Sequence, residues 1–413
     1  MEVVFECCCG IDVHKDTVVA CVVKGPKGPS FKREVRTFGT TTAELLRLRD
    51  WLEAECVTHI AMESTGVYRK PVYNVLEGAA ELWLINAQHV KNLPGRKTDV
   101  KDCEWLADLL RHGLVRASFV PDTDTRELRE LTRYRTQLVR DRVSEVNRIQ
   151  KLLEGANLKL GSVVSDVLGV SGRAILDAIV RGESDPQKLA DLAVDRIKKR
   201  KKADLVLALE GRIRGHHRFM LKMLLGHIDE LDNHIEEASR EIEIRMRPFE
   251  DSIQRMDAIP GIARRAAEVI VAEIGMDMTR FRTVGHLASW AGMCPGNKAS
   301  GGKRLSGKTR KGSPWLRRIL VEAGWAAIRV QKSYFKTQYA RLKRHMPPKK
   351  AIVAVAHSIL GVIYHLLKNG TTYRDLGPDH FQQADRAAIA RGLKRRIESL
   401  GFQVTVQEKP HVA

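Results

Sequence analysis

Apolar and polar residues alternate in short runs over the first hundred residues of the chain. The runs at 3–9 and 17–23 are rich in β-branched and other apolar residues, which is typical of buried strands. The same signals predict, in chain order, strands at 3–9, 17–23 and 31–38, a helix from Thr41 or Thr42 to about 55, a strand at 58–64, a helix near 68–78, a strand at 81–86 and a further helix. This pattern predicts an α/β domain.

The spacing of apolar residues changes after Pro121 and Asp122. Residues 123–153 contain no Gly or Pro, and their apolar positions recur at intervals of three and four, which predicts one long amphipathic helix. A second long helix is predicted over roughly 217–247. Two long helices separated by a helical insert favour an antiparallel coiled coil or bundle arm. The basic run RIKKRKK at 196–202 in the insert is either a solvated helix end or a nucleic-acid contact.

Residues 251–370 are predicted to form the last folded domain. IPGIARRAAEVIVAEIG at 259–275 places a Pro-Gly turn before a helix. The free N–H groups at the start of this helix could hold a phosphate. Alternatively, the segment is an ordinary turn and helix. The apolar run at 351–367 is short for a membrane span and contains two His and one Ser, so a buried core helix explains it better. We therefore predict an α/β domain at 1–121, a helical arm at 122–250, a last domain at 251–370 and a tail at 371–413.

The charge of the chain is strongly positive and unevenly distributed. The 413 residues have a formal net charge of +20, and 43% are hydrophobic, which excludes a disordered chain. Residues 290–350 contain sixteen Lys or Arg and one acid, whereas residues 1–110 contain fourteen Lys or Arg against sixteen acids. A localised positive field favours a polyanionic partner, most often nucleic acid.

Cysteine usage and the N-terminal sequence indicate a compartment. The seven cysteines are odd in number and none are paired at the spacing of zinc ligands, which is typical of reduced thiols in a cytosolic protein. Glu2 and Glu6 stand where a signal peptide would have a basic region. We therefore expect a cytoplasmic protein that is not in a membrane.

Four carboxylates stand at corresponding points of the predicted elements. GIDVHKD places Asp12 at the end of the first strand, and AMESTG places Glu63 at the end of the fourth. KTDVKDCEWL places Asp99 and Asp102 at a helix start, three residues apart and so on one face. The predicted element order is that of an RNase H-like fold, in which these strand ends and that helix start converge.

A cluster of this kind predicts a metal site. Four carboxylates in one cleft repel each other and need a cation, and oxygen ligands suit Mg²⁺ or Mn²⁺. Two such ions about 3.5–4 Å apart can orient and polarise a phosphodiester. Alternatively, Asp99 is a helix N-cap, Asp102 a surface acid and Glu63 a loop residue.

The segment NKASGGKRLSGKTRKG, residues 297–312, is the most basic stretch of the last domain. It contains six Lys or Arg, four Gly and no acid. Glycines let the backbone approach a phosphate closely, and the cations neutralise it. Ser300 and Ser306 could each hydrogen-bond a phosphate or attack it, and composition leaves the two roles open. The residues predicted to contact nucleic acid are Lys298, Lys303, Arg304, Lys308, Arg310, Lys311 and Arg317.

Two sets of blocks resemble one transposase family. GIDVHK, MESTGVY and KTDVKDCEWLADLL resemble the DEDD, RuvC-like domain of insertion-sequence transposases of the IS110 family. AIPGIARRAAEVIVAEIG, FRTVGHLASWAGMCPGNKASGGKRLSGKTRKGSPWLRRILVEA and KKAIVAVAHSIL are similar to the family's second domain. The blocks cover most of residues 8–370 in the family's order. The resemblance implies a RuvC-like α/β domain, a long coiled-coil arm and a mostly helical transposase domain.

The resemblance also implies a mechanism. Ser300, in SGGK, occupies the family's nucleophile position and would form a 5′-phosphoserine link with DNA, while Ser306 would at most contact phosphate. The four carboxylates would hold the metals that assist this step. The family's members are recombinases of bacteria and archaea, guided by a structured bridge RNA that their own element encodes. A homodimer or homotetramer is implied, in which the DEDD domain of one subunit meets the serine segment of another. The resemblance also implies that the protein is associated with the nucleoid.

Two rival functions follow from the same residues. One is a RuvC-like metal-dependent nuclease that hydrolyses branched DNA and leaves Ser300 idle. The other is a non-catalytic RNA- or DNA-binding protein, which would not need four carboxylates. His286 and His345 are candidate general bases for Ser300 with no further support from the sequence.

Overall fold

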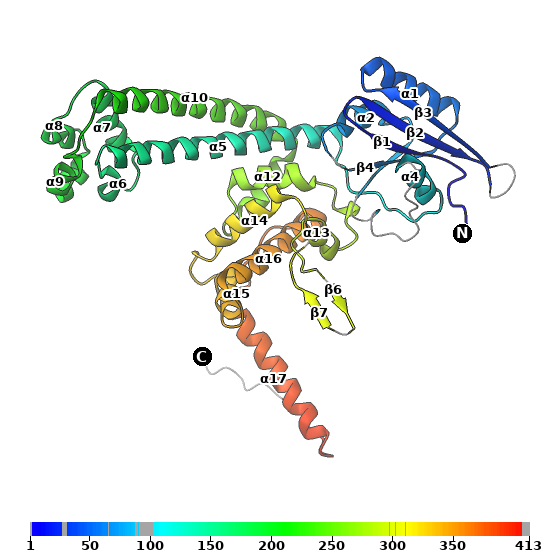
Figure 1. Ribbon diagram of the computed structural model, residues 1–413. Coiled ribbons are helices and arrows are strands. Elements are labelled where there is room, and N and C mark those ends of the chain that lie inside the picture. The colour runs from blue at the N-terminus through cyan, green and yellow to red at the C-terminus, as the bar shows by residue number, and fades with distance from the viewer. Residues whose placement is uncertain are drawn as a thin grey trace. The chain divides into compact units, whose positions relative to one another are not determined.

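The structure is a computed structural model in which the chain divides into two compact units, Met1–Val120 and Pro121–Ala413 (Figure 1). The described residues are 2–26, 31–64, 66–86, 90, 102–296, 298–301, 303–309 and 311–406, with the backbone alone at 298–300, 303–306 and 382–388. Each unit is described by itself. The predicted division into four parts stays a prediction.

The first unit contains a five-stranded sheet in the order β3-β2-β1-β4-β5. The strands are β1 (Cys7–Val13), β2 (Thr17–Lys24), β3 (Lys32–Gly39), β4 (His59–Glu63) and β5 (Glu81–Ile85). Strand β2 pairs antiparallel with both β1 and β3, whereas β4 is parallel to β1 and β5 is parallel to β4. The elements follow each other along the chain in the predicted order, so the α/β prediction is confirmed.

Helices cover both faces of the sheet. One face packs against α1 (Thr42–Ala54) and α2 (Arg69–Leu76), and the other against α4 (Asp102–Arg111). Successive residues of β1 alternate between the two clusters, with Cys9 on the α1 side and Cys8 on the α4 side. Burial raises the pKa of the Cys8 thiol to about 12, so this thiol stays protonated and packs as a small apolar group.

Helix α4 touches the backbone of β1 at Gly10. A Cβ atom at this position would lie 2.1 Å from the carbonyl oxygen of Cys103 and 2.4 Å from the amide nitrogen of Ala107. Such distances exclude any side chain, because a strand glycine is where another backbone can approach closely. The close packing of α4 on the sheet therefore requires glycine at this position.

The second unit begins with two long helices, α5 (Thr123–Gly155) and α10 (Gly215–Met246). Between them lie α6 (Leu160–Val163), α7 (Val170–Val180), α8 (Pro186–Asp191) and α9 (Asp195–Leu209). The predicted pair of long helices and the helical insert are therefore confirmed as elements. The basic run at 196–202 lies in α9, where Lys198 forms an ion pair with Asp195 at 3.0 Å.

The two long helices run antiparallel. Arg142 of α5 forms an ion pair with Asp232 of α10, and Glu127, earlier in α5, forms one with Arg245, later in α10. Apolar residues of both helices meet between these ion pairs. The arm is thus a helix hairpin with an apolar seam and charged flanks.

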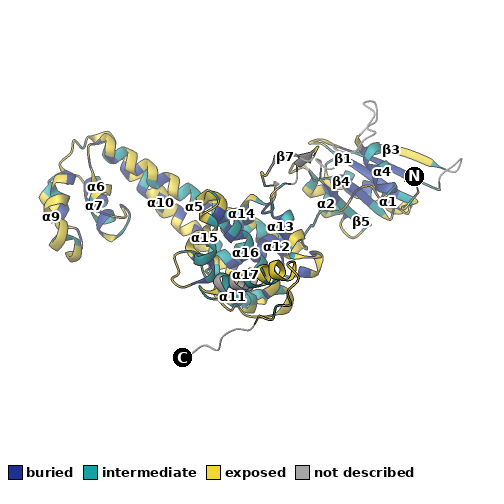
Figure 2. Ribbon diagram, turned by 90° about the horizontal axis from the view of Figure 1, so that it is seen from below, coloured by how far each residue is buried: buried dark blue, intermediate teal, exposed yellow. Residues whose placement is uncertain are grey.

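The remaining elements of this unit form a helical body. They are α11 (Glu250–Asp257), α12 (Arg264–Ile274), α13 (Val284–Trp290), β6 (Lys298–Ser300), β7 (Lys303–Ser306), α14 (Pro314–Ala327), α15 (Tyr334–Lys343), α16 (Pro348–Asn369) and α17 (His380–Glu398), with 3₁₀ turns at Arg247–Phe249 and Met278–Arg280. Buried residues are concentrated where α12, α14 and α16 meet, whereas exposed residues follow the outer side of α10 (Figure 2).

Helix α16 is the apolar run at 351–367. By length and composition alone it could cross a membrane, but half of its most apolar stretch is buried inside the protein. It packs against α13, α14 and α15, and the hydroxyl of Tyr364 near its end donates a hydrogen bond to the carbonyl oxygen of Phe281 at 2.9 Å. These contacts agree with the predicted core helix.

We expect Gly10→Ala to destabilise the first unit by about 1–3 kcal/mol, because the added methyl group overlaps the backbone of α4. Hydrogen exchange of the β1 and α4 amides in the full chain would measure the loss. The control is Gly226→Ala, at an open position within α10, where alanine should stabilise the helix by about 0.5–1 kcal/mol. Unchanged protection of α4 in Gly10→Ala would contradict the direct contact.

Candidate active site

Two of the predicted metal ligands lie at neighbouring strand ends. In the parallel pair β1–β4, Gly10 stands opposite Ala61. Both residues face α4, because the Cβ position of Gly10 is filled by α4 and Ala61 lies in the α4 cluster. Asp12 and Glu63 each follow two residues later, so strand alternation places them side by side on the same face.

Helix α4 places Asp102 toward the same end of the sheet. The helix runs antiparallel to β1: the thiol of Cys8 lies 3.8 Å from the carbonyl oxygen of Ala107, and Gly10, further along β1, lies against Cys103. Continuing along both elements brings the end of β1 toward Asp102, the first residue of α4. Three of the four predicted carboxylates are thus arranged around one end of the sheet.

The described side chains do not form a complete set of metal ligands. Within the described ranges, no group of three or more His, Cys, Asp and Glu is close enough to hold an ion. Asp99, the fourth predicted ligand, lies outside the described residues. Asp12 is about one-quarter exposed, and its Oδ2 lies 3.1 Å from Nε2 of His14, a contact that the sequence interpretation missed. The oxygen donors on the α4 face are the kind that Mg²⁺ and Mn²⁺ prefer.

The basic segment has a Gly-rich composition typical of a loop, but it contains a short β-hairpin formed by β6 and β7. Ser300 ends β6 and pairs with Lys303 at the start of β7, whereas Ser306 pairs with Lys298 at the far end. Gly301, in the turn, has a φ of +56°, a left-handed conformation that favours glycine. The backbone of Ser300 therefore lies at the tip of the hairpin. Gly-rich composition predicts a loop, but glycine in the turn also permits tight strand pairing.

Backbone contacts close the base of this hairpin. Pro295 and Thr309 form an isolated antiparallel bridge. The amide of Gly296 donates a hydrogen bond to the carbonyl oxygen of Lys308 at 2.8 Å. The side chains of Lys308 and Lys311, two of the predicted nucleic-acid contacts, are exposed.

Arg317, another predicted nucleic-acid contact, holds the hairpin base. Its Nη1 donates hydrogen bonds to the carbonyl oxygen of Gly292 at 3.1 Å and to Oγ1 of Thr309 at 2.5 Å. The backbone of Gly312 lies against Gly292, where a Cβ atom would be 2.4 Å from the Gly292 nitrogen. Lys298, Lys303 and Arg304 are described by backbone alone, and Arg310 lies outside the described residues.

Neither candidate base for Ser300 gains a catalytic contact from the described residues. Nδ1 of His286 lies 2.9 Å from Oγ1 of Thr283, the N-cap of α13. His345 is exposed just after α15.

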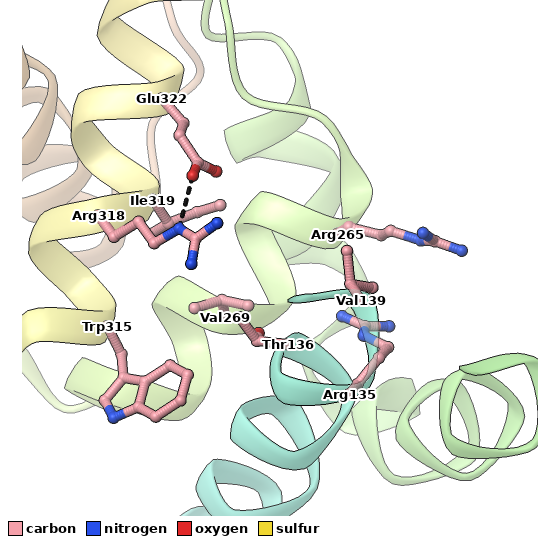
Figure 3. Close-up of a pocket in the computed structure, with 9 residues that line it drawn as sticks. All are labelled: Arg135, Thr136, Val139, Arg265, Val269, Trp315, Arg318, Ile319 and Glu322. Carbon is pink, nitrogen blue, oxygen red and sulfur yellow. Dashed lines mark hydrogen bonds and ion pairs between the residues drawn. The ribbon is translucent and has the colours of Figure 1, made fainter. Parts of the chain in front are cut away.

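A pocket lies beside the hairpin exit, between α5, α12 and α14 (Figure 3). Val139, Val269 and Ile319 line it with apolar surface, and Trp315 stands at one end. At the rim, Nε of Arg318 donates a hydrogen bond to Oε1 of Glu322 at 2.7 Å. Arg318 is therefore paired locally, in contrast to its neighbour Arg317.

Comparison with known proteins matches two stretches of the chain to transposases. Residues 9–158 match the model of transposases with the DEDD domain of IS110, and residues 253–340 match that of the transposase IS116/IS110/IS902 family. The chain is 23% identical over 370 residues to the transposase for insertion sequence element IS1111A of Coxiella burnetii, covering 88% of this chain and 90% of that protein.

Shorter alignments link the chain to two Streptomyces proteins. It is 31% identical over 128 residues to a 43.6 kDa protein of insertion element IS110 from Streptomyces coelicolor, spanning 30% of each chain. It is 28% identical over 273 residues to a 44.8 kDa protein of insertion element IS116 from Streptomyces clavuligerus, spanning 58% of this chain and 65% of that protein. The fold, the two matched domains and these relatives define a transposase, an enzyme that acts on DNA. The chain belongs to the IS110 family of these enzymes.

We expect Arg317→Gln to weaken the base of the hairpin, because it removes the charged donor to two oxygens. A hydrogen bond from a charged group contributes about 1.5–3 kcal/mol to stability. The amide of Gly296 should exchange its hydrogen at least roughly tenfold faster. Arg318→Gln is the control, since Arg318 bonds to the exposed Glu322 instead. Equal exchange in both variants would show that Arg317 does not hold the hairpin.

Proposed function

We propose that this transposase is a DNA recombinase that cuts and rejoins the ends of its insertion element and a target through a covalent link to Ser300. The observation that carries the proposal is the position of the Ser300 backbone at the tip of a basic hairpin, within the matched region 253–340. A tip residue can reach into a DNA backbone, and the cations of both strands can neutralise the phosphate it attacks.

The chemistry of the proposed step balances. The Oγ of Ser300 attacks the phosphorus, forming a P–Oγ bond while the bond to the 3′ oxygen breaks. The serine proton is lost, and one proton is taken up by the departing 3′ oxygen, which leaves as a 3′-OH. The phosphoserine keeps the energy of the phosphodiester, so a different 3′-OH can reverse the step and join new ends without an added cofactor.

The carboxylates would hold the divalent metal that a DEDD domain suggests. Asp12, Glu63 and Asp102 would be its ligands with Asp99, on the basis of their oxygen chemistry and their placement at one end of the sheet. A bound Mg²⁺ or Mn²⁺ would polarise the phosphate and stabilise charge on the leaving oxygen. The strand order around these residues supports an RNase H-like, RuvC-like domain.

The proposal includes two further partners. A structured guide RNA encoded by the element would select the DNA by base pairing, which suits a protein whose positive charge is localised. A homodimer or homotetramer would bring the DEDD domain of one subunit to the hairpin of another, with α5 and α10 as a coiled-coil dimerisation arm. Such a complex would work in the cytoplasm, at the nucleoid.

We expect strand exchange to require Mg²⁺ or Mn²⁺ and to be abolished by Asp12→Asn, Glu63→Gln, Asp99→Asn or Asp102→Asn. Each substitution removes one anionic oxygen ligand and keeps the shape of the side chain. Activity and Mn²⁺ binding by calorimetry are measured together, and circular dichroism reports the fold. Asp16→Asn, an exposed acid outside the proposed set, is the control. Full recombination in excess EDTA would refute the metal requirement.

We expect wild type and Ser306→Ala to form a protein–DNA adduct, and Ser300→Ala to form none. Loss of one hydroxyl from a short polar hairpin should cost little stability, so binding of DNA and RNA should persist. The reaction is trapped on labelled element-end DNA and resolved on a denaturing gel. An adduct in Ser300→Ala that maps to Ser306 or Tyr334 would identify another nucleophile. Cleavage without any adduct would favour the alternative, a RuvC-like nuclease that acts by metal-assisted hydrolysis.

A further inference from the structure

Helix α12 contains a carboxylate that is fully removed from solvent. Glu273 has no exposed surface, although carboxylates are rarely buried unless they are paired. Arg133 of α5 donates two hydrogen bonds to it, from Nε to Oε1 at 2.7 Å and from Nη2 to Oε2 at 2.9 Å. Nε of Arg129, also in α5, lies 3.8 Å from Oε2. The arm helix thus neutralises this charge.

The third donor to Glu273 comes from the exit of the hairpin. The hydroxyl of Ser313 donates a hydrogen bond to Oε2 of Glu273 at 2.8 Å. The Oγ of Ser313 in turn accepts the amide hydrogen of Leu316, as the N-cap of α14. Ser313 follows Gly312, where the chain leaves the hairpin against Gly292. One carboxylate therefore joins the arm, α12 and the chain that leaves the hairpin.

A second contact reinforces this joint. Trp315, two residues after Ser313, lies under the guanidinium of Arg140, whose Cζ is 4.6 Å from the ring centroid. The Cζ of Arg133 lies 5.7 Å from the same centroid. Cation–π contacts of this geometry add to the attachment of α14 to α5. Figure 3 shows Trp315 at the end of the pocket that α5 borders.

We propose that Glu273 is a positioning residue for Ser300, which sets the hairpin relative to the arm through Ser313. A buried ion pair contributes little net stability after desolvation, and its best-attested role is to fix one arrangement of packed elements. Here the arrangement includes the exit of the hairpin whose tip is Ser300. This inference rests on the proposed nucleophilic role of Ser300, and it predicts that the arm and the cleavage step are coupled.

The same helix offers a matched control. Glu268 is also buried and also pairs with α5, through Nη2 of Arg135 at 2.8 Å. Its other partner is Arg264 of its own helix, at 3.2 Å. None of its described ion pairs involves the hairpin or Ser313. Glu268→Gln should therefore disturb the α5–α12 contact as Glu273→Gln does, without releasing the hairpin.

The test is single-turnover adduct formation by the full-length protein on labelled element-end DNA, with the element's own non-coding RNA. We expect Glu273→Gln to lower the adduct rate at saturating DNA by roughly 10–100-fold, the size of effect that a misplaced catalytic group produces. The DNA dissociation constant should not change. Glu268→Gln should lower the melting temperature to a similar extent and keep the wild-type adduct rate.

A double-mutant cycle separates positioning from general destabilisation. If Glu273 acts through Ser313, then Glu273→Gln should reduce the rate far less in a Ser313→Ala background than in wild type. Ser333→Ala removes the equivalent N-cap of α15 and should show no such coupling with Glu273→Gln. Independent, multiplying effects of Glu273→Gln and Ser313→Ala would overturn the proposal, as would equal adduct rates in Glu273→Gln and Glu268→Gln.

Hydrogen exchange keeps the inference testable if the chemistry differs. Should wild type form no adduct, the proposed function fails, but exchange at the Gly296 amide still reports whether the hairpin is held. Faster exchange at this amide in Glu273→Gln than in Glu268→Gln supports the link to the hairpin. Equal exchange in the two variants overturns it.

Discussion

A charge that is taken out of water must be matched by its neighbours, and this constraint determines how the helical body joins the arm. Glu268 and Glu273 lie in α12 among apolar residues, and each is matched by an arginine of α5. If α12 shifted along α5, both carboxylates would lose their arginine partners and would be left buried and unpaired. The two ion pairs therefore permit one register of α12 on the arm.

The hairpin needs such a support more than other parts of the chain do. A two-stranded hairpin is marginally stable by itself, and this one is strongly basic, so its own charges repel. Its base is tied to two different helices, to α14 through Arg317 and to α12 through Ser313. These ties hold the base of the hairpin in place.

Features that depend on local patterns could be predicted from the sequence. The β-branched runs at 3–9 and 17–23 correspond to β1 and β2, and the three-and-four spacing from 123 onward corresponds to α5. The placement of Asp12 and Glu63 at neighbouring strand ends could also be predicted, because parallel strands of one sheet share their carboxyl end.

Features that depend on distant partners could not be predicted. The spacing of apolar residues does not tell whether Glu273 faces solvent or the core of the protein. Its partner Arg133 is 140 residues away along the chain. The hairpin has the composition of a loop, and only its pairing shows that Ser300 is at the tip and Ser306 at the far end. The nucleophilic role proposed for Ser300 came from the family resemblance, since composition did not distinguish attack on a phosphate from contact with it.

The difference between buried and exposed charge gives the protein two responses to ionic strength. Salt would weaken the phosphate contacts proposed for exposed lysines such as Lys308, because such contacts release counterions. It hardly screens the pair between Glu273 and Arg133, whose carboxylate has no contact with solvent. Concentrated salt should therefore strip nucleic acid from the enzyme and leave the hairpin base in place. After the salt is diluted, the rate at which activity recovers would depend on rebinding of nucleic acid and not on refolding of the hairpin base.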